Sequence, residues 1–398
     1  METHKIKFLN MKYGFQFVLL FVVLLGIIPF FSQNSEGATR KPPEMMTLMT
    51  YDVGSSGYTA YGFVGEALAN QLKIKLRAIP VGNDVGRMMG LKAGEVQFAG
   101  QGVDLYFAMM GLDRYTEKKW GPQDLRVAWM AQHAGYGMAA RADSGIKTIA
   151  DVKGKKCGWI PGSVMNDLFG ALLAYGNLTW NDVVKVTVPS YAANIKGLLD
   201  GTVDVCSGQV TSAAFYEVET GPHGLRWIPM PAADDAAFTR VRQKLPLLVP
   251  YQATEGPGIS SKMPFECTTY AYPATICYSN LNNDIAYFMT KAINEGYASM
   301  AKASNMMKYS WNLDSFLKLY EKYDYAIMHP GTVLYLKDIG KWNPAWDKLQ
   351  EKRIKYFKDL QAFWGEVIKQ ADLEKVKTEE FSQYWLKKQS DFIKKIKH

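Results

Sequence analysis

The amino-acid sequence predicts two doubly wound α/β lobes joined by a hinge, followed by a helical extension. Short apolar runs alternate with apolar stripes at helical spacing, which is the pattern of parallel strands covered by helices. This alternation occurs twice, each time as strand-helix-strand-helix-strand with a polar, glycine-containing turn after the first strand. A chain of 398 residues that is 48% hydrophobic is long and apolar enough to form two or three compact units.

An apolar run near the amino terminus predicts an export signal. Lysines precede this run, which spans residues 17–31, and small polar residues follow it. We therefore expect residues 1–37 to be a cleavable signal peptide and the mature chain to be periplasmic. An uncleaved membrane anchor is the alternative, because the run is short for a membrane span but Phe15 extends it.

The first round of alternation assigns residues 44–133 to the first lobe. Its strands are expected at residues 46–51, 76–79, 96–99 and 127–130. The second round assigns residues 134–250 to the second lobe. Its strands are expected at residues 156–160, 185–188 and 202–206, and its helices at 164–175 and 192–199. In such sheets the carboxyl ends of strands and the amino ends of helices share the edge at which ligands bind.

The rest of the chain is expected to return to the first lobe and then to extend as helix. Residues 251–340 form this return segment, with a strand at 274–278 and a helix that begins at residue 282. In residues 341–398 apolar side chains recur at spacings of three and four, which predicts a helical extension packed on a lobe. Docking of this extension to a partner protein is the alternative.

Composition and charge exclude several classes of protein. The apolar and aromatic content excludes a disordered chain, a disulfide-rich miniprotein and a multispanning membrane protein. The formal net charge is +8, and residues 341–398 supply most of it, with 14 basic and 9 acidic residues. Because these charges are mixed with acidic and apolar residues, they indicate a solvated helical face, and we expect no nucleic-acid partner.

Export also bears on the four cysteines, since an oxidising compartment permits disulfides. Cys267 and Cys277 flank the turn signal Ala271-Tyr272-Pro273, which predicts a hairpin-type bridge between them. Cys157 and Cys206 lie in apolar strand-like runs, where a bridge and two buried free thiols are equally compatible with the pattern.

Two strand-to-helix turns are candidates for binding an anion. Helix amino ends leave N–H groups unpaired and carry partial positive charge, and glycines let a ligand approach the backbone. Taken alone, each turn also fits an ordinary serine-capped helix start. Small capping residues at equivalent turns of both rounds favour one anion site that the two lobes share. Its residues are Gly54, Ser55, Ser56, Gly57 and Tyr58 in one lobe, and Pro161, Gly162 and Ser163 in the other.

Further candidates lie at the same predicted edges. Asn83 follows a strand and either bonds a ligand or caps its helix, and capping is the more common role. Gln101 and Gln209 follow equivalent strands and either face the cleft or bond loop backbone. Trp159 and Tyr251, together with Tyr58, are candidates for stacking on the ligand, and wall or core packing is their alternative.

The sequence contains no pattern that indicates catalysis. The five histidines have no metal-type spacing, and the phosphate-cradling, nucleophile-elbow and dinucleotide-binding motifs are missing from the sequence. His329-Pro330-Gly331 fits a turn into a helix better than a catalytic base, because no nucleophile accompanies it. We expect no catalytic residue, no metal and no cofactor. An exported enzyme and a sensor or adaptor protein on the same two-lobed fold are the alternatives.

The chain resembles the TAXI-type extracytoplasmic solute receptors of tripartite ATP-independent periplasmic (TRAP) transporters. The resemblance runs from about residue 46 to residue 340, and it rests on the joint order of several short blocks. These are Gly54-Ser55-Ser56-Gly57-Tyr58 with Gly62 and Gly65-Glu66-Ala67-Leu68-Ala69, Leu91-Lys92-Ala93-Gly94-Glu95, Asp143-Ser144-Gly145-Ile146-Lys147-Thr148-Ile149-Ala150-Asp151-Val152-Lys153-Gly154-Lys155-Lys156, Pro161-Gly162-Ser163, Leu199-Asp200-Gly201-Thr202-Val203-Asp204 and His329-Pro330-Gly331.

This resemblance implies a two-lobed receptor of the type II periplasmic binding protein class. Such a receptor closes on a small organic anion, a carboxylate, and delivers it to the TRAP membrane permease without chemistry. The ligand-contacting turns of the family correspond to residues 55–58 and 161–163. The chain continues nearly sixty residues past Gly340, beyond the family pattern, which adds a surface for docking or packing.

Overall fold

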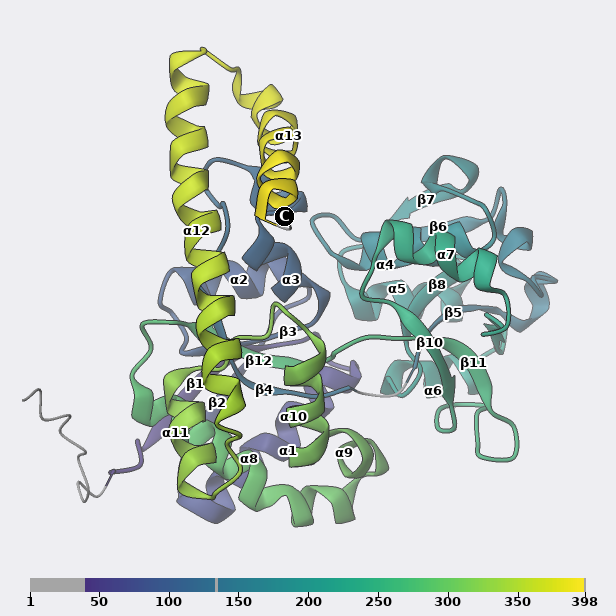
Figure 1. Ribbon diagram of the computed structural model, residues 1–398. Helices are drawn as coiled ribbons and strands as arrows, with labels where there is room; N and C mark the ends of the chain where they lie inside the picture. The colour runs from purple at the N-terminus through teal and green to yellow at the C-terminus, as the bar shows by residue number, and fades with distance from the viewer. Residues whose placement is uncertain (1–39, 133–134, 397–398) are drawn as a thin grey trace, which may run out of the picture. The chain divides into compact units, whose positions relative to one another are not determined.

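The structure is a computed structural model that describes residues 40–132 and 135–396 (Figure 1). The predicted signal peptide, residues 1–37, lies outside the described residues. From Lys41 onward the chain forms one compact unit that contains two β-sheets. We call the part built on each sheet a lobe.

The first lobe is built on a five-stranded sheet with the order β2-β1-β3-β12-β4. Its parallel strands are β1 (Met45–Thr50), β2 (Lys75–Pro80) and β3 (Phe98–Gln101). Strand β12 (Ala274–Tyr278) runs antiparallel between β3 and β4 (Leu125–Met130). The connecting helices are α1 (Ser56–Leu72), α2 (Asp84–Lys92) and α3 (Val103–Met110).

The second lobe is built on a seven-stranded sheet with the order β10-β11-β5-β8-β6-β7, and β9 also pairs with β5. These strands are β5 (Tyr136–Arg141), β6 (Lys156–Trp159), β7 (Val184–Thr187), β8 (Val205–Gln209), β9 (Leu225–Ile228), β10 (Val249–Ala253) and β11 (Phe265–Thr269). Its helices are α4 (Met165–Tyr175), α5 (Tyr191–Asp200), α6 (Ala213–Thr220) and α7 (Asp235–Lys244).

Both lobes contain the repeated unit that the sequence predicts. In the first, β1, β2 and β3 pair in parallel in the order β2-β1-β3, and in the second β6, β7 and β8 pair in the equivalent order β7-β6-β8. An antiparallel strand then lies beside the third strand of each unit, β12 in the first lobe and β5 in the second. The predicted fold class, two doubly wound α/β lobes with a helical carboxyl-terminal extension, is confirmed.

The return to the first lobe comes later in the chain than residue 251. Strands β10 and β11 form an antiparallel pair that extends the second sheet beyond β5. The chain then crosses at Tyr270–Pro273 and enters the first sheet as β12. The expected boundary at 251 is wrong because this strand pair completes the second sheet before the crossing.

The predicted bridge between Cys267 and Cys277 is also wrong. Cys267 lies in β11 of the second sheet and Cys277 in β12 of the first, and both are free and buried. The turn signal between them marks the crossing between two sheets and not the loop of a hairpin. Cys157 and Cys206 are buried free thiols as well, which is one of the two arrangements that the sequence leaves open.

The chain after β12 is helical to its end. The helices are α8 (Asn283–Ala303), α9 (Asn305–Ser310), α10 (Leu313–Lys322), α11 (Pro330–Asp338), α12 (Ala345–Leu373) and α13 (Thr378–Ile396). His329 is the N-cap of α11 and accepts a hydrogen bond from Gly331 N through Nδ1 at 3.1 Å, as expected for a turn into a helix. Burial lowers the pKa of His329 to about 4.

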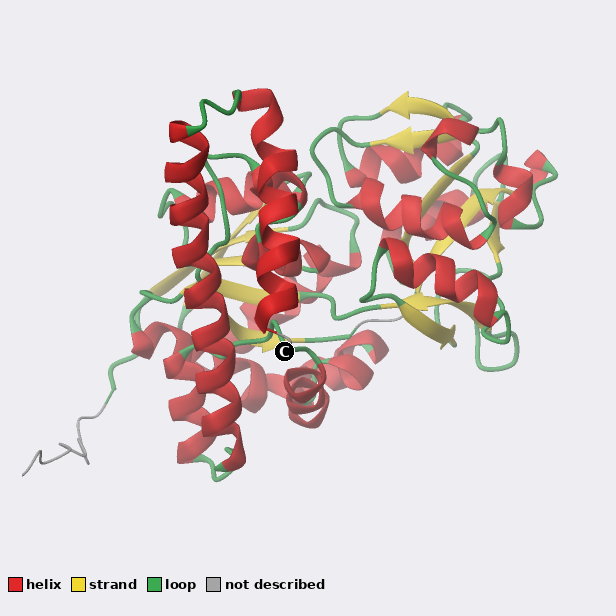
Figure 2. Cartoon of the chain, turned by 45° about the horizontal axis from the view of Figure 1, so that its top comes forward, coloured by secondary structure: helices red, strands yellow, loops and turns green. Residues whose placement is uncertain are grey.

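The extension is a hairpin of two helices that packs on the first lobe (Figure 2). Helix α12 buries its apolar stripe, including Phe357, Leu360 and Trp364. Helix α13 contacts the short turn η1 (Asp113–Thr116) of the first lobe, and Trp385 Nε1 donates to Gly111 O at 2.6 Å. No helix in residues 40–132 and 135–396 combines the length and apolarity that crossing a bilayer requires.

Candidate functional site

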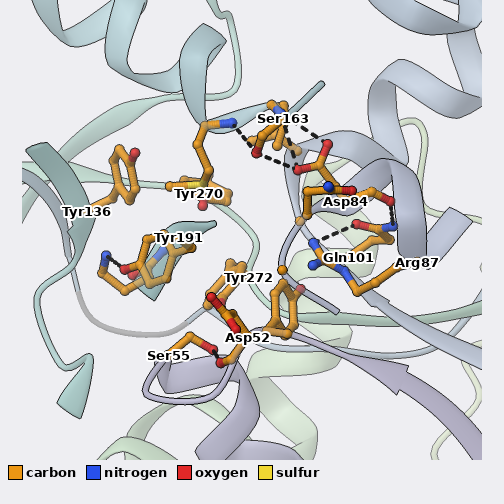
Figure 3. Close-up of a pocket in the computed structure, with 18 residues that line it drawn as sticks. Asp52, Ser55, Asp84, Arg87, Gln101, Tyr136, Ser163, Tyr191, Tyr270 and Tyr272 are labelled. Atoms are coloured by element: carbon orange, nitrogen blue, oxygen red, sulfur yellow. Dashed lines mark hydrogen bonds between the residues drawn. The ribbon is translucent and has the colours of Figure 1, made fainter. Parts of the chain in front are cut away.

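A cavity lies between the two sheets and is lined by residues from both lobes (Figure 3). It encloses an empty volume of about 520 Å³, part of which is open to solvent. The carboxyl ends of β1, β3 and β8 and the amino ends of α2 and α4 contribute to its wall. This is the position at which doubly wound sheets bind their ligands.

Five of the residues that the sequence singles out line this cavity. They are Ser55, Asn83, Gln101, Ser163 and Gln209. Gln101 and Gln209 are the last residues of β3 and β8, which are the third strands of the two repeated units. Equivalent positions in the two lobes therefore bring the two amide side chains to one cavity.

In the first lobe the serine and asparagine act as helix caps. Ser55 Oγ accepts a hydrogen bond from Tyr58 N at 3.1 Å and donates to Asp52 O at 2.7 Å. Asn83 Oδ1 accepts from Gly86 N at 2.8 Å at the start of α2. These side chains satisfy donors of their own helices, which is the structural alternative that the sequence leaves open.

In the second lobe the anion-binding position expected at the amino end of α4 is filled by a side chain of the protein. Asp84, from α2 of the first lobe, accepts from Ser163 Oγ at 2.8 Å and from Val164 N at 3.0 and 3.2 Å (Figure 3). The amino end of α4 is thus neutralised by a carboxylate from the opposite lobe. The expectation that this end stands open for a ligand is wrong.

Two other helices of the second lobe meet the first lobe in the same way. Ala192 N, at the start of α5, donates to Asp52 Oδ2 at 3.0 Å. Ala214 N, at the start of α6, donates to Gly54 O at 3.3 Å. Three helix amino ends of one lobe therefore receive an oxygen atom from the other, and these contacts hold the lobes together.

Asp84 also belongs to an acidic cluster around one arginine. Arg114 Nη1 lies 2.6 Å from Asp84 Oδ2 and 2.5 Å from Asp104 Oδ1. Burial and the Asp84 charge raise the pKa of Asp104. Asp167, on α4 of the second lobe, lies 3.9 Å from Arg114, and burial raises its pKa to about 7. A single guanidinium thus balances several carboxylates at the contact between the lobes.

Arg87 on α2 is a buried cation that sequence reasoning missed. Its Nε, Nη1 and Nη2 donate to Gly100 O at 2.8 Å, Val81 O at 3.1 Å and Gln101 Oε1 at 3.4 Å. Only 6% of Arg87 is exposed, and within the described residues no carboxylate oxygen lies within 4.0 Å of it. A positive charge near the amino end of a helix interacts unfavourably with the helix dipole. An arginine at such a position was therefore the signal in the sequence that could have pointed to Arg87.

Five tyrosines complete the wall, and sequence reasoning missed them as well. They are Tyr51, Tyr136, Tyr191, Tyr270 and Tyr272. Ring centroids of neighbouring pairs lie 4.9–5.8 Å apart in edge-to-face contact. Burial raises the pKa of each of the five, so the hydroxyls are neutral.

The remaining predicted residues do not line the cavity. Trp159 packs on Trp180 with Lys185 over its ring, and Tyr251 packs beside the Phe265 and Cys267 cluster of the second sheet. Pro161, Gly162 and Tyr58 are exposed. Gly54 supplies the carbonyl that receives α6, and Ser56 is buried at the start of α1.

Gly57 has a packing role beneath the wall. A Cβ atom there would lie 2.3 Å from the Tyr51 ring and 2.5 Å from the Tyr272 hydroxyl. Only glycine allows α1 to approach the tyrosines so closely. Among residues 40–132 and 135–396, no group of three or more histidine, cysteine, aspartate or glutamate side chains is arranged to hold a metal ion.

Several solved structures are similar to this chain. The alkanesulfonate-binding protein SsuA from Xanthomonas axonopodis pv. citri is 15% identical, with a TM-score of 0.41, over 79% of this chain and 84% of that one. The aliphatic sulphonate binding protein SsuA from Escherichia coli is 14% identical, with a TM-score of 0.42, over 80% and 93%. The amino acid ABC transporter substrate-binding protein AbpA from Streptococcus pneumoniae, bound to L-arginine, is 13% identical, with a TM-score of 0.38, over 79% and 96%.

No curated protein matches the chain in sequence. The model of one protein family does match, over residues 54–340, which is well over half of the 398 residues. That match begins after β1 and spans the rest of the first repeated unit, the whole second unit, the crossing between the sheets and the helices up to α11. The chain belongs to the NMT1-like family.

Proposed function

We propose that this protein is a periplasmic solute-binding receptor that captures a small organic anion between its two lobes. Arg87 is the observation that carries the proposal. It is a buried cation on the wall of a cavity between two sheets, without a carboxylate partner among the described residues. A buried charge is costly unless it is paired, and an anionic ligand supplies the missing partner.

The mechanism is differential binding to the open and closed forms. In the open form each wall is hydrated, whereas in the closed form the ligand contacts residues of both lobes. Hydrogen bonds to a charged group contribute about 1.5–3 kcal/mol each, and micromolar affinity requires about 8 kcal/mol. A few contacts to Arg87 and to the cavity amides therefore suffice, and the proposal needs no chemical step.

We further propose that the receptor delivers a carboxylate to a TRAP-type permease. The sequence blocks that resemble the TAXI receptors fall almost entirely within residues 54–340, the segment that matches the NMT1-like family. The lysine-flanked apolar run at 17–31 supports export. Recovery of the mature protein from the periplasm with its amino terminus near Ala38 tests this location.

Native mass spectrometry of protein purified without unfolding tests the binding function. We expect the wild-type protein to carry a small acidic ligand, and Arg87→Met to lose it. Arg77→Met is the matched control, because Arg77 is an exposed arginine on β2 of the same lobe and lies away from the cavity. Ligand retained by Arg87→Met as fully as by the control contradicts the proposal.

A further inference from the structure

The chemistry of the cavity wall narrows the class of ligand. We infer that the ligand is a small acid with one negative charge and a flat, unsaturated body. This inference rests on the proposed binding function and adds to it the charge and shape of the ligand. Three features of the wall carry it: the balance of charge, the donors next to Arg87, and the state of the tyrosine hydroxyls.

The balance of charge limits the ligand to one acidic group. Among the described residues that line the cavity, Arg87 is the only cation, and Asp52 and Asp84 are the anions. Both aspartates already receive hydrogen bonds from helix amino ends of the second lobe. A second acidic group on the ligand would therefore lie near carboxylates without a cation to balance it.

Two side chains in one corner of the cavity have donors available for the acidic group. Arg87 uses three of its five N–H groups within the protein, so two remain for a ligand. Its guanidinium lies 4.4 Å from the centroid of the Tyr51 ring, which fixes its plane. The Tyr51 hydroxyl is buried, and it has no hydrogen-bond partner among the described residues. Together they supply an arginine fork and a neutral hydroxyl donor.

The other tyrosines offer ring surface and not hydroxyl groups. Tyr136 Oη is hydrogen-bonded to Ser207 Oγ at 2.6 Å. Tyr191 Oη is hydrogen-bonded to Ser212 Oγ at 2.9 Å and accepts from Gln209 N at 3.1 Å. A sugar or polyol needs free hydroxyl partners, whereas a conjugated ring packs against aromatic faces and edges. Both tyrosines belong to the second lobe, so closure brings them onto a body anchored at Arg87.

Isothermal titration calorimetry with four probes tests charge and shape separately. The probes are benzoate, its saturated analogue cyclohexanecarboxylate, its neutral analogue benzamide, and the dianion terephthalate. We expect benzoate to bind at least tenfold more tightly than each of the other three. Arg87→Met should weaken benzoate about 100-fold, and Arg77→Met should leave it unchanged.

Tyr136→Leu keeps the charge of the wall and replaces an aromatic ring by an aliphatic side chain, and it also removes the hydroxyl that is bonded to Ser207. We expect it to remove the preference for benzoate over cyclohexanecarboxylate, and this variant decides the question of shape if Arg87→Met does not fold. Equal or tighter binding of cyclohexanecarboxylate or terephthalate by the wild type overturns the inference.

Identification of the ligand retained by the native protein separates the two proposals. A conjugated monoacid supports both. A saturated acid or a dianion overturns the ligand class and leaves the receptor function standing. A protein that retains nothing and binds none of the probes contradicts both.

Discussion

The carboxylate of Asp84 offers the sharpest test of how the two lobes are held together. Asp84→Asn keeps the size of the side chain and removes its charge. In the protein this carboxylate accepts from Ser163 Oγ and Val164 N across the lobes and also pairs with Arg114. Two charge-assisted bonds of about 1.5–3 kcal/mol each set the gross contribution at about 3–6 kcal/mol. Loss of repulsion with Asp104 offsets part of this.

We expect Asp84→Asn to weaken the contact between the lobes by about 2–4 kcal/mol, which shifts the ratio of open to closed ligand-free protein roughly 30-fold to 700-fold. Pulsed electron spin resonance measures this shift between spin labels at Asn70→Cys on α1 and Lys196→Cys on α5. Both positions are exposed, and the four native cysteines are buried, so the labels attach where they are placed.

The control is Asp143→Asn, an exposed carboxylate that pairs only within the second lobe, with His223 and Arg141. We expect its distance distribution to match that of the wild type. A distribution for Asp84→Asn that also matches the wild type would mean that the carboxylate does not hold the lobes together, and the reasoning would fail.

Three further predictions concern stability. Trp385→Ala should lower the free energy of unfolding by about 3–5 kcal/mol in a denaturant titration, whereas Leu373→Ala, at a position 84% exposed, should change it by less than about 0.5 kcal/mol. His329 has a folded pKa of about 4, below its unfolded value, so its contribution to the free energy of unfolding is present above pH 6.5 and is lost as the pH falls toward 4. The wild type should therefore lose up to about 3 kcal/mol more of its stability over this pH range than His329→Asn does. Asp167 has a raised folded pKa of about 7, so its contribution to the free energy of unfolding is present below pH 4 and is lost as the pH rises through 7. Melting temperatures should show Asp167→Asn more stable relative to the wild type at pH 8 than at pH 5, and equal differences would refute this.

The fold was largely predictable because strands buried on both faces appear as apolar runs. The two repeated units begin with the apolar runs 46–51 and 156–160. Strands were expected at both runs, and β1 and β6 lie there. The missed strands lack this signal. Strand β10 alternates partly buried and exposed residues and lies at the edge of its sheet, and β5 is buried but half of its residues are glycine or alanine. The pairing of these strands with their neighbours depends on contacts between residues that are far apart in the chain.

The site was predictable only where one strand end or one helix start defines it. Gln101 and Gln209 were identified because each ends the third strand of a repeated unit. Asp84 was not, because an acidic residue in the first turn of a helix already has a local explanation in the helix dipole. Its contact with Ser163 joins residues 79 positions apart, and no local pattern encodes that distance.

The occupied helix ends change what the ligand must do. In the clamp expected from the sequence, the anion itself joins the two lobes, so an empty receptor would have no reason to close. With Asp52 and Asp84 at the amino ends of α5 and α4, the closed contact exists without a ligand. The ligand then adds stability mainly by pairing with Arg87, which is buried in the closed form whether or not an anion is present. Selectivity for an anion over a neutral ligand therefore arises from the cost of leaving that cation unpaired, and selectivity for the body of the ligand arises from the tyrosine rings.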